Sequence, residues 1–460
     1  MSSSTEAPRP RAVLVGVQLP SVTDAEQRSS LKELERLCKT LGFAVVGEVM
    51  QKRKSLGAAT LLGEGKLAEL AAWTGGTGVV PKGPPGKKTA TEEAEEEEEE
   101  EDDETEPPTL EAPPAPTGEP RATVVVIDHD LSPRQLRHIK AATSAAAVLD
   151  RTGVIIEIFH RHASSRPARL QVEIARLTYV APRLRQTGGG ERQRGGIGQR
   201  GAGESSVELD RRKIRDRISE LKAELAAIDD ESKTRRAKRQ EALRVALVGY
   251  TNAGKSSLMR ALTGSHVVVA DKLFATLDTT VRALWPESRP RILVSDTVGF
   301  IKKLPHDLVA SFRSTLDEAL EASLLLHIVD AADPGFLAQM QVTREVLDDI
   351  GAGDVPWLLV LNKIDKVAET DRERLSTEFP AALLVSAKDP ADVGRVRDAI
   401  IGAFEATMRE LEFVVPYNAG RAIGEIHKLN VISESYQGDG VHYRVRAPES
   451  AIERIRAMLR

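Results

Sequence analysis

The sequence is short of cysteine and of long apolar runs, and each shortage excludes a class of protein. Its 460 residues include one cysteine, Cys38, which rules out a disulfide framework and a cysteine-rich metal site. The most apolar stretch, 324–332, is far shorter than the roughly 18 residues of a membrane-spanning helix. The first residues show no charged-then-apolar secretory pattern. We therefore expect a soluble, cytoplasmic protein whose closest approach to a membrane is peripheral attachment.

The formal net charge of −5 conceals a strongly acidic block. Between Glu92 and Glu106 there are 13 acidic residues and no basic residue, and without them the formal charge becomes +8. The remainder of the chain is therefore net basic, which suits an RNA partner because phosphate contacts come chiefly from Lys and Arg. Aromatic residues, at 4%, are not interleaved with the basic stretches as on a single-strand-binding surface. We expect the acidic block to repel RNA or to compete for basic surfaces.

The length corresponds to about three domains, and composition places their boundaries. We predict an N-terminal α/β domain over 1–182 that contains a disordered acidic insertion over 74–120. A glycine- and arginine-rich loop with a helical hairpin follows over 183–242. A second α/β domain covers 243–408, and a small α+β module covers 409–460.

Hydrophobic periodicity predicts the elements of the N-terminal domain and the hairpin. Strands are expected at 12–19, 44–50 and 123–127, and helices at 24–42 and 132–147. In the hairpin, apolar residues recur at spacings of four and three, the seam of a helix that packs on a partner: Ile214, Ile218, Leu221, Leu225 and Ile228. The charges at 229–231 predict a turn, and 233–239 a returning helix.

The second α/β domain is predicted to contain a mostly parallel sheet covered by helices on both faces. Six apolar strands alternate with helices, at 243–248, 281–285, 291–295, 324–330, 357–361 and 382–386. From Glu412 to Arg460 the pattern predicts a strand, a helix, two strands and a helix.

The run from Gly249 to Ser256 fits GxxxxGK[ST], the phosphate-binding loop, and lies between a predicted strand and a predicted helix, as its chemistry requires. The glycines let backbone amides face phosphates, and Lys255 reaches the outer phosphates. The Ser256 hydroxyl can ligate Mg²⁺. Downstream, Asp296 ends a strand and can hold Mg²⁺ through water, while the Gly299 amide can meet a γ-phosphate.

The residues from Asn362 to Asp365 follow another strand and indicate the base. The Asp365 carboxylate can accept two hydrogen bonds from guanine N1 and its exocyclic amine, a donor pair that adenine lacks. Ser386, Ala387 and Lys388 end the last strand and can add backbone contacts to guanine O6. Four motifs at strand ends on one sheet edge predict that the chain binds GTP and GDP.

Thr276 is the candidate switch hydroxyl that completes Mg²⁺ coordination when the γ-phosphate is present, with Thr279 and Thr280 as alternatives. The predicted nucleotide-binding residues are Gly249, Tyr250, Thr251, Asn252, Ala253, Gly254, Lys255, Ser256, Phe274, Ala275, Thr276, Leu277, Asp278, Asp296, Thr297, Val298, Gly299, Asn362, Lys363, Ile364, Asp365, Ser386, Ala387 and Lys388. Among these the predicted metal ligands are Ser256 and Thr276, with Asp296 acting through water.

These motifs resemble the HflX family of translation-factor-class GTPases. The resemblance is carried by 245–256, 271–278, 296–301 and 304–306, and outside that domain by 149–153, 170–173 and 201–212. One departure stands at 201–210, where the family usually has Gly-x-Gly-Glu-Thr-Gln-Leu-Glu-Thr-Asp and this chain has Gly-Ala-Gly-Glu-Ser-Ser-Val-Glu-Leu-Asp. The glycine loop before it is also altered, so we expect that loop's contacts to differ.

The resemblance implies a monomeric GTPase that binds the large ribosomal subunit and its rRNA and acts in ribosome dissociation or rescue. Phe300 stands where many GTPases place a water-orienting glutamine, which predicts slow intrinsic hydrolysis. Asn252 resembles a residue that ligates K⁺ in related GTPases, so K⁺ joins Mg²⁺ as an expected cofactor. The predicted catalytic residues are Lys255, Thr276, Gly299 and Asn252. Two alternatives remain: a GTP-controlled protein that docks on a membrane protease or other protein, and an ATP-dependent RNA remodeller with a second nucleotide site in the N-terminal domain.

Three weaker patterns are interpreted as structural. The histidines and aspartates at 128–130 and 160–162 lack zinc-like partners at suitable spacing. The run 63–66 is shorter than a phosphate-binding loop and is predicted to be a turn that starts a helix. Cys38 is predicted to be a core residue of the first helix.

Overall fold

The computed structural model describes residues 9–57, 60–80, 121–184, 206–237, 243–264, 273–274, 280–302 and 318–459. Most of the predicted acidic insertion, the glycine- and arginine-rich loop and the switch threonine lie outside the described residues. The chain forms two compact units, one of 1–161 with 169–223 and the other of 162–168 with 224–460. In the described part, no helix is both long enough and apolar enough to cross a membrane.

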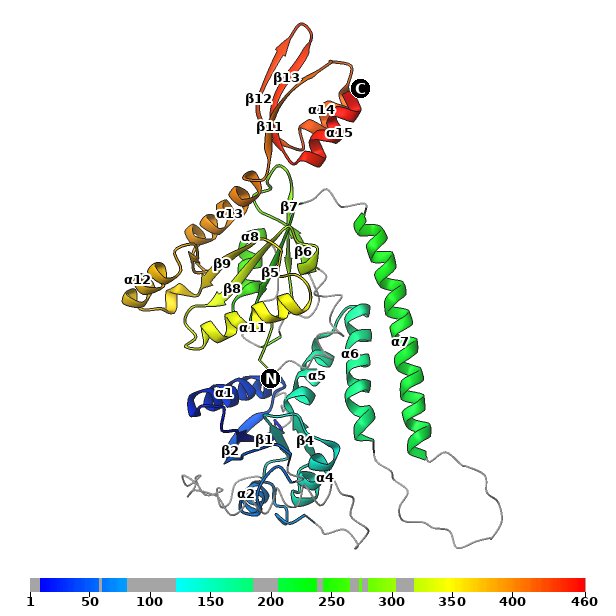
Figure 1. Cartoon of the computed structure of the whole chain (residues 1–460), viewed down its shortest axis with the longest axis vertical. Helices are drawn as coiled ribbons and strands as arrows, with labels where there is room; N and C mark the ends of the chain where they lie inside the picture. Colours follow the sequence, from blue (N-terminus) through cyan, green and yellow to red (C-terminus); the bar gives the residue numbers. More distant parts are fainter. Residues whose placement is uncertain are drawn as a thin grey trace, which may run out of the picture. The chain divides into compact units, whose positions relative to one another are not determined.

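The first unit is built on a four-stranded parallel sheet in the order β2-β1-β3-β4. Figure 1 labels three of these strands, β1, β2 and β4. Its strands are β1 (Arg11–Gln18), β2 (Ala44–Lys52), β3 (Val124–Ile127) and β4 (Ala147–Asp150). The accompanying helices are α1 (Asp24–Thr40), α2 (Glu64–Thr74), α4 (Pro133–Ala142) and α5 (Arg151–His162). Because β3 pairs with β1, the strands that precede and follow residues 81–120 lie in one sheet.

Helices cover both faces of this sheet. Alternate residues of β1 face opposite sides, so β1 contacts helices on both. Val13, Val15 and Val17 pack in one cluster with residues of α2 and α4. Gly16 points to the other side, where an added Cβ would lie 3.1 Å from Cδ1 of Leu31 in α1. Gly63 is the N-cap of α2, so the helix-starting turn predicted at 63–66 is confirmed. Cys38 is buried on α1 as predicted, and burial raises the pKa of its thiol to about 12.

The predicted helix over 132–147 is too long. A capping box at Ser132 begins α4, but the helix ends at Ala142, because Thr143 adopts an extended conformation. The last residue of the predicted helix, Ala147, is the first residue of β4, which pairs with β3. A strand of four residues between two helices is too short to give a periodic signal of its own.

The turn predicted at 229–231 is wrong, since α7 (Ser206–Ala237) runs through it without a break. Neither Gly nor Pro occurs in that part of the helix, and charged residues alone do not end a helix. The hairpin is instead formed by α7 and α6 (Arg166–Val180), which a short 3₁₀ turn (Ala181–Arg183) follows. Arg166 pairs with Glu224, and Glu173 with Arg217, so the two helices run antiparallel. Leu221 of the predicted seam is fully buried, and its other members are half-buried.

The second unit contains a six-stranded sheet in the order β10-β9-β8-β5-β7-β6, in which only β6 among the described strands is antiparallel. Its strands are β5 (Leu243–Gly249), β6 (Thr280–Ala283), β7 (Ile292–Asp296), β8 (Leu324–Asp330), β9 (Trp357–Asn362) and β10 (Leu383–Leu384). Its helices are α8 (Lys255–Thr263), α11 (Phe336–Asp349), α12 (Glu369–Glu378) and α13 (Pro390–Glu405), with a 3₁₀ turn at Ile364–Lys366. All six predicted strands are present: the strand at 324–330 has the predicted ends, and the ends of the other five are shifted by at most two residues.

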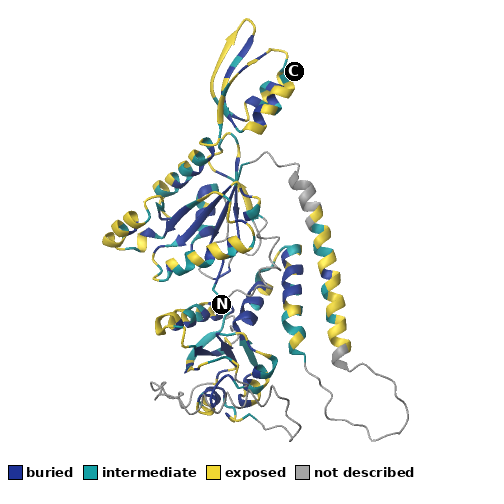
Figure 2. Ribbon diagram, in the orientation of Figure 1, coloured by how far each residue is buried: buried dark blue, intermediate teal, exposed yellow. Residues whose placement is uncertain are grey.

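Helices cover both faces of this sheet, as predicted, so its central strands are buried (Figure 2). The helices α8 and α13 contribute Leu258, Met259 and Ile400 to the core on one face. On the other face, α11 and α12 contribute Leu347 and Leu375 to two further clusters. With both faces covered, the carboxyl ends of the parallel strands are the edge at which loops are open to a ligand.

The C-terminal segment has the predicted order of strand, helix, two strands and helix. It consists of β11 (Arg409–Val415), α14 (Gly420–Ile426), β12 (Asn430–Gln437), β13 (Gly440–Ala447) and α15 (Glu449–Leu459). The sheet is antiparallel, in the order β11-β13-β12, and packs on the two helices through a core of its own.

Arg151 is the largest buried polar side chain of the first unit and joins three of its elements. Its exposed fraction is 1%, and that of its partner Asp128 is 0%. The guanidinium donates to Oδ1 of Asp128 at 2.7 and 2.9 Å and to Oε2 of Glu33 at 2.9 Å. Burial acts to lower the pKa of Arg151, but the two carboxylates outweigh it and raise the pKa.

Replacing Arg151 by Met should strongly destabilise the first unit, because Asp128 would stay buried without its positive partner. We expect a loss of about 3–5 kcal/mol. Hydrogen exchange of the β3 amides measures this loss locally. The control is Lys39→Met, which breaks an exposed pair with Glu35 and should cost less than about 1 kcal/mol. Equal losses of protection in the two variants would contradict the prediction.

Candidate functional site

The phosphate-binding loop predicted from sequence joins the end of β5 to the start of α8, which leaves the first amides of α8 without partners within the helix. Two glycines make the tight path possible. A Cβ on Gly249 would lie 2.1 Å from the Ile328 oxygen, and one on Gly254 would lie 2.2 Å from Nδ2 of Asn362. Both residues also have positive φ, of 147° and 98°, which disfavours a side chain. The loop therefore presents backbone amides at a helix N-terminus, an anion-binding arrangement.

Lys255 is buried in this loop with its ammonium group held by backbone oxygens. Its Nζ donates to Gly249 O at 3.0 Å and to Tyr250 O at 2.9 Å. Burial lowers the pKa of Lys255 to about 8, although the nearby Asp296 carboxylate acts to raise it. A bound phosphate would stabilise the charged form and raise this pKa.

Ser256 and Asp296 come from α8 and β7 and meet beside Lys255. The Ser256 hydroxyl donates to Oδ2 of Asp296 at 2.7 Å, and Asp296 is fully buried. A hydroxyl and a carboxylate are oxygen ligands of the kind that Mg²⁺ prefers, so the donor set fits this ion. Thr276, the third predicted ligand, lies outside the described residues, as do Ala275, Leu277, Asp278 and the alternative Thr279. Phe274 is described and buried, and Thr280 begins β6.

The segment after Asp296 is fastened to the phosphate-binding loop by backbone hydrogen bonds. Thr251 N donates to Phe300 O at 2.7 Å, and Phe300 N donates to Gly249 O at 3.1 Å. This places Gly299 against Lys255, where an added Cβ would be 2.9 Å from Nζ. The Phe300 side chain is buried in a cluster beneath α11. Its ring is therefore part of the core.

Asn362 and Lys363 connect the segment after β9 to the same loop. The Asn362 amide donates to Ala253 O at 2.9 Å and accepts from Ala387 N at 3.1 Å. The Lys363 ammonium donates to Asn252 O at 2.7 Å and to Oδ2 of Asp330 at 2.7 Å. Asp330 was not predicted as a site residue. Its position at the end of β8, beside the strand that carries Asn362, was the available signal.

Asp365 lies with Ser386 and Lys388, as the motif order predicted. Its two oxygens accept from Ser386 Oγ at 2.9 Å and from Lys388 Nζ at 3.2 Å. Burial acts to raise the pKa of Asp365, but these hydrogen bonds hold it below its ordinary value, so the group is ionised at neutral pH. The three side chains line an open pocket of about 760 Å³. Asp392, also missed from sequence, accepts from Ser386 N at 2.7 Å and fixes that turn.

Three other predicted residues have their side chains in the core. The Thr297 hydroxyl donates to Leu247 O at 2.7 Å, and both Val298 and Ile364 are buried. Their backbone stands at the open edge of the sheet, so nucleotide contact by these residues would be through backbone atoms.

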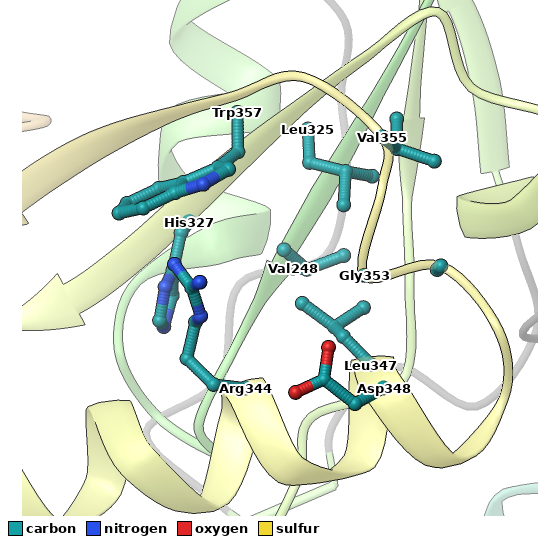
Figure 3. Close-up of a pocket in the computed structure, with 10 residues that line it drawn as sticks. Val248, Leu325, His327, Arg344, Leu347, Asp348, Gly353, Val355 and Trp357 are labelled. Atoms are coloured by element: carbon teal, nitrogen blue, oxygen red, sulfur yellow. The ribbon is translucent and has the colours of Figure 1, made fainter.

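A separate, small cavity lies beneath α11 and is lined by His327, Arg344 and Trp357 (Figure 3). Its volume of about 10 Å³ accommodates about one water. Among the residues that the structure describes, neither nitrogen of the buried His327 ring has a hydrogen-bond partner, and burial lowers the pKa of the ring to about 4. The cavity is too small for a nucleotide.

The fold, the phosphate-binding loop and the motifs at 296–299 and 362–365 define a P-loop GTPase. Three family models match the chain: GTP-binding GTPase N-terminal over 28–80 and 116–160, GTP-binding GTPase Middle Region over 162–239, and 50S ribosome-binding GTPase over 244–363. The chain is 58% identical to a GTPase HflX of Gluconacetobacter diazotrophicus over 99% of both chains. It is 34% identical to the GTPase HflX of Escherichia coli K12, over 95% of this chain and 93% of the relative. The chain belongs to the HflX family of GTPases.

Among solved structures, the chain is similar to a GTP-binding protein from Sulfolobus solfataricus in complex with GDP. The sequence identity is 23% and the TM-score 0.42, over 85% of this chain and 98% of that one.

Because the pKa of Lys255 is about 8 in the nucleotide-free protein, GDP binding near that pH should take up a proton. The phosphates favour the charged amine, so the affinity for GDP should fall as the pH rises above 8. Calorimetric titrations at pH 8 in two buffers of different ionisation enthalpy should report an uptake of about half a proton. At pH 7, where Lys255 is already charged, the uptake should be near zero. Equal proton uptake at both pH values would contradict the assignment of this proton to Lys255.

Proposed function

We propose that the chain uses this site to bind GTP and Mg²⁺ and that the bound nucleotide controls its association with the large ribosomal subunit, in ribosome dissociation or rescue. The observation that carries the proposal is the membership in the HflX family together with the match of 244–363 to a family described as a 50S ribosome-binding GTPase. The first half of α7 supports an RNA partner, because it exposes five basic side chains: Arg211, Arg212, Lys213, Arg215 and Arg217.

In the proposed complex, the base is selected by Asp365. An ionised carboxylate accepts two hydrogen bonds from guanine N1 and the exocyclic amine. The turn of Ser386, Ala387 and Lys388 would add a backbone contact to guanine O6, for which the Ala387 amide would exchange its present acceptor, Oδ1 of Asn362. Adenine presents no such donor pair, so its binding would leave Asp365 desolvated and unpaired, which costs about 1–3 kcal/mol or more for a charged group. GTP is therefore favoured over ATP.

The phosphates are held by the amides of residues 249–256 and by Lys255, whose ammonium group must exchange its two backbone oxygens for phosphate oxygens. Mg²⁺, when bound, supplies positive charge that neutralises the transferring phosphoryl group. Its proposed ligands are Ser256 and Thr276, with Asp296 acting through water. The Gly299 amide is the proposed donor to the γ-phosphate.

Hydrolysis by the isolated chain is proposed to be slow, at or below about 10⁻⁴–10⁻² s⁻¹. Phe300 has no polar group to orient the attacking water, and its side chain is buried in the core. A partner would supply the missing organisation. Asn252 is the proposed K⁺ ligand beside the phosphates, so turnover should be faster in K⁺ than in Na⁺ buffer at equal ionic strength. Equal rates would exclude this role.

Sedimentation with large ribosomal subunits tests the proposed function directly. The full chain should pellet with the subunits in the presence of a non-hydrolysable GTP analogue and should stay largely in the supernatant with GDP. The affinity should also fall steeply with salt, because Lys and Arg contacts to RNA release counterions.

The base-specificity variant Asp365→Asn provides the matched control. It should fail to pellet with the GTP analogue and should regain pelleting with the corresponding XTP analogue, because xanthine offers the complementary hydrogen-bonding pattern. Equal pelleting of the wild-type chain with GDP and with the GTP analogue would contradict nucleotide control. No pelleting under either condition would favour a protein partner without a ribosome.

A further inference from the structure

Asp330 stands at the open edge of the six-stranded sheet but belongs to none of the four nucleotide motifs. It is the last residue of β8 and lies opposite Asn362 in the register of β8 with β9. Its Oδ1 accepts a hydrogen bond from Ala332 N at 3.1 Å, so the turn after β8 fixes the carboxylate. Its Oδ2 lies 2.7 Å from Nζ of Lys363.

The pair formed by Asp330 and Lys363 is largely removed from water, with side chains that are 18% and 19% exposed. The ammonium group is shared, because the same Nζ donates to Asn252 O in the phosphate-binding loop at 2.7 Å. A lysine stem has several rotatable bonds and loses much entropy when it is held in one geometry. The charge-assisted hydrogen bond to Asp330 is a second contact of the ammonium group, and it holds the Lys363 side chain in this geometry.

The Lys363 side chain links two residues whose backbones are both in the left-handed region. Asn252 has a φ of 61° and Lys363 a φ of 62°; asparagine tolerates this region, whereas lysine seldom adopts it. The hydrogen bond from the Lys363 ammonium group holds the carbonyl of Asn252 while the Asn252 backbone is in the left-handed conformation. Without Asp330, the ammonium group would have one backbone oxygen left and would move toward water or toward a bound phosphate.

We propose that Asp330 is a positioning residue for nucleotide binding, which acts through Lys363 to hold the phosphate-binding loop in its binding conformation. The inference rests on the proposed assignment of residues 249–256 to the phosphates and of Asp365 to the base. It adds a contact from β8 to a site otherwise built from β5, β7, β9 and the turn after β10. Because Asp330 is proposed to act through Lys363 and is assigned to neither the base nor the phosphates, its loss should weaken the binding of all guanine nucleotides alike.

The dissociation rate of a fluorescent GDP analogue from the full chain measures this effect. Asp330→Ala should raise the rate about tenfold, a change of about 1.4 kcal/mol. Asp330→Asn keeps the shape and a hydrogen-bond acceptor but loses the charge, so its rate should be intermediate. In the Lys363→Ala background, Asp330→Ala should add nothing, because the residue through which it acts is already missing.

The matched control is Glu321→Gln, which breaks the ion pair with Arg244 in the same unit. Arg244 lies near the amino end of β5, at the other end of the strand from the phosphate-binding loop. This variant should release GDP at the wild-type rate. The preference for guanine over xanthine nucleotides should also be unchanged by Asp330→Ala, since Asp365 is intact.

A rate for Asp330→Ala within twofold of wild type would overturn the inference. So would an undiminished effect in the Lys363→Ala background, or an equal effect of Glu321→Gln, because each indicates a general loss of structure. A wild-type chain that does not bind the GDP analogue would overturn the proposed function and this inference together. Wild-type binding with unaltered variant kinetics would overturn the inference alone.

Discussion

The nucleotide site depends on one constraint: the phosphate-binding loop is held in place by side chains and backbone from other strands. Asn362 holds Ala253 O, Lys363 holds Asn252 O, and Phe300 O accepts from Thr251 N. A loop with glycines at both ends has large conformational freedom in isolation, and closing it around an anion would cost entropy. These three hydrogen bonds order the loop in the folded protein, so less entropy is lost when a ligand binds.

This arrangement makes base recognition and phosphate binding parts of one structure. The Asn362 amide links Ala253 of the phosphate-binding loop to Ala387 on the turn that carries Ser386 and Lys388. Those two residues in turn hold the Asp365 carboxylate. The buried amide of Asn362 therefore connects the base-recognition turn directly to the phosphate-binding loop. The segment after Asp296 contacts the same loop through the backbone hydrogen bonds of Phe300 with Gly249 and Thr251.

Much of this site could be predicted from sequence, because each motif follows a strong apolar strand and the carboxyl ends of parallel strands share one edge. The strands at 324–330 and 357–361 were placed closely for that reason. Contacts between elements could not be predicted. In the sequence, Asp330 is an ordinary strand-end residue; only the register of β8 and β9, which sets it opposite Asn362, brings it within reach of the Lys363 ammonium group. The unbroken α7 and the short β4 were also missed, because local charge and four-residue strands carry weak signals. The roles of Thr276 and of the acidic residues at 92–106 stay predictions.

Hydrogen exchange with guanosine in place of GDP shows whether the base and phosphate sites form one coupled structure. Guanosine occupies the base site and offers no phosphate. At saturation it should slow exchange in the phosphate-binding loop, 249–256, as well as in the base-recognition segment, 357–366. Slowed exchange confined to the base-recognition segment, with the loop protected only by GDP, would contradict the account.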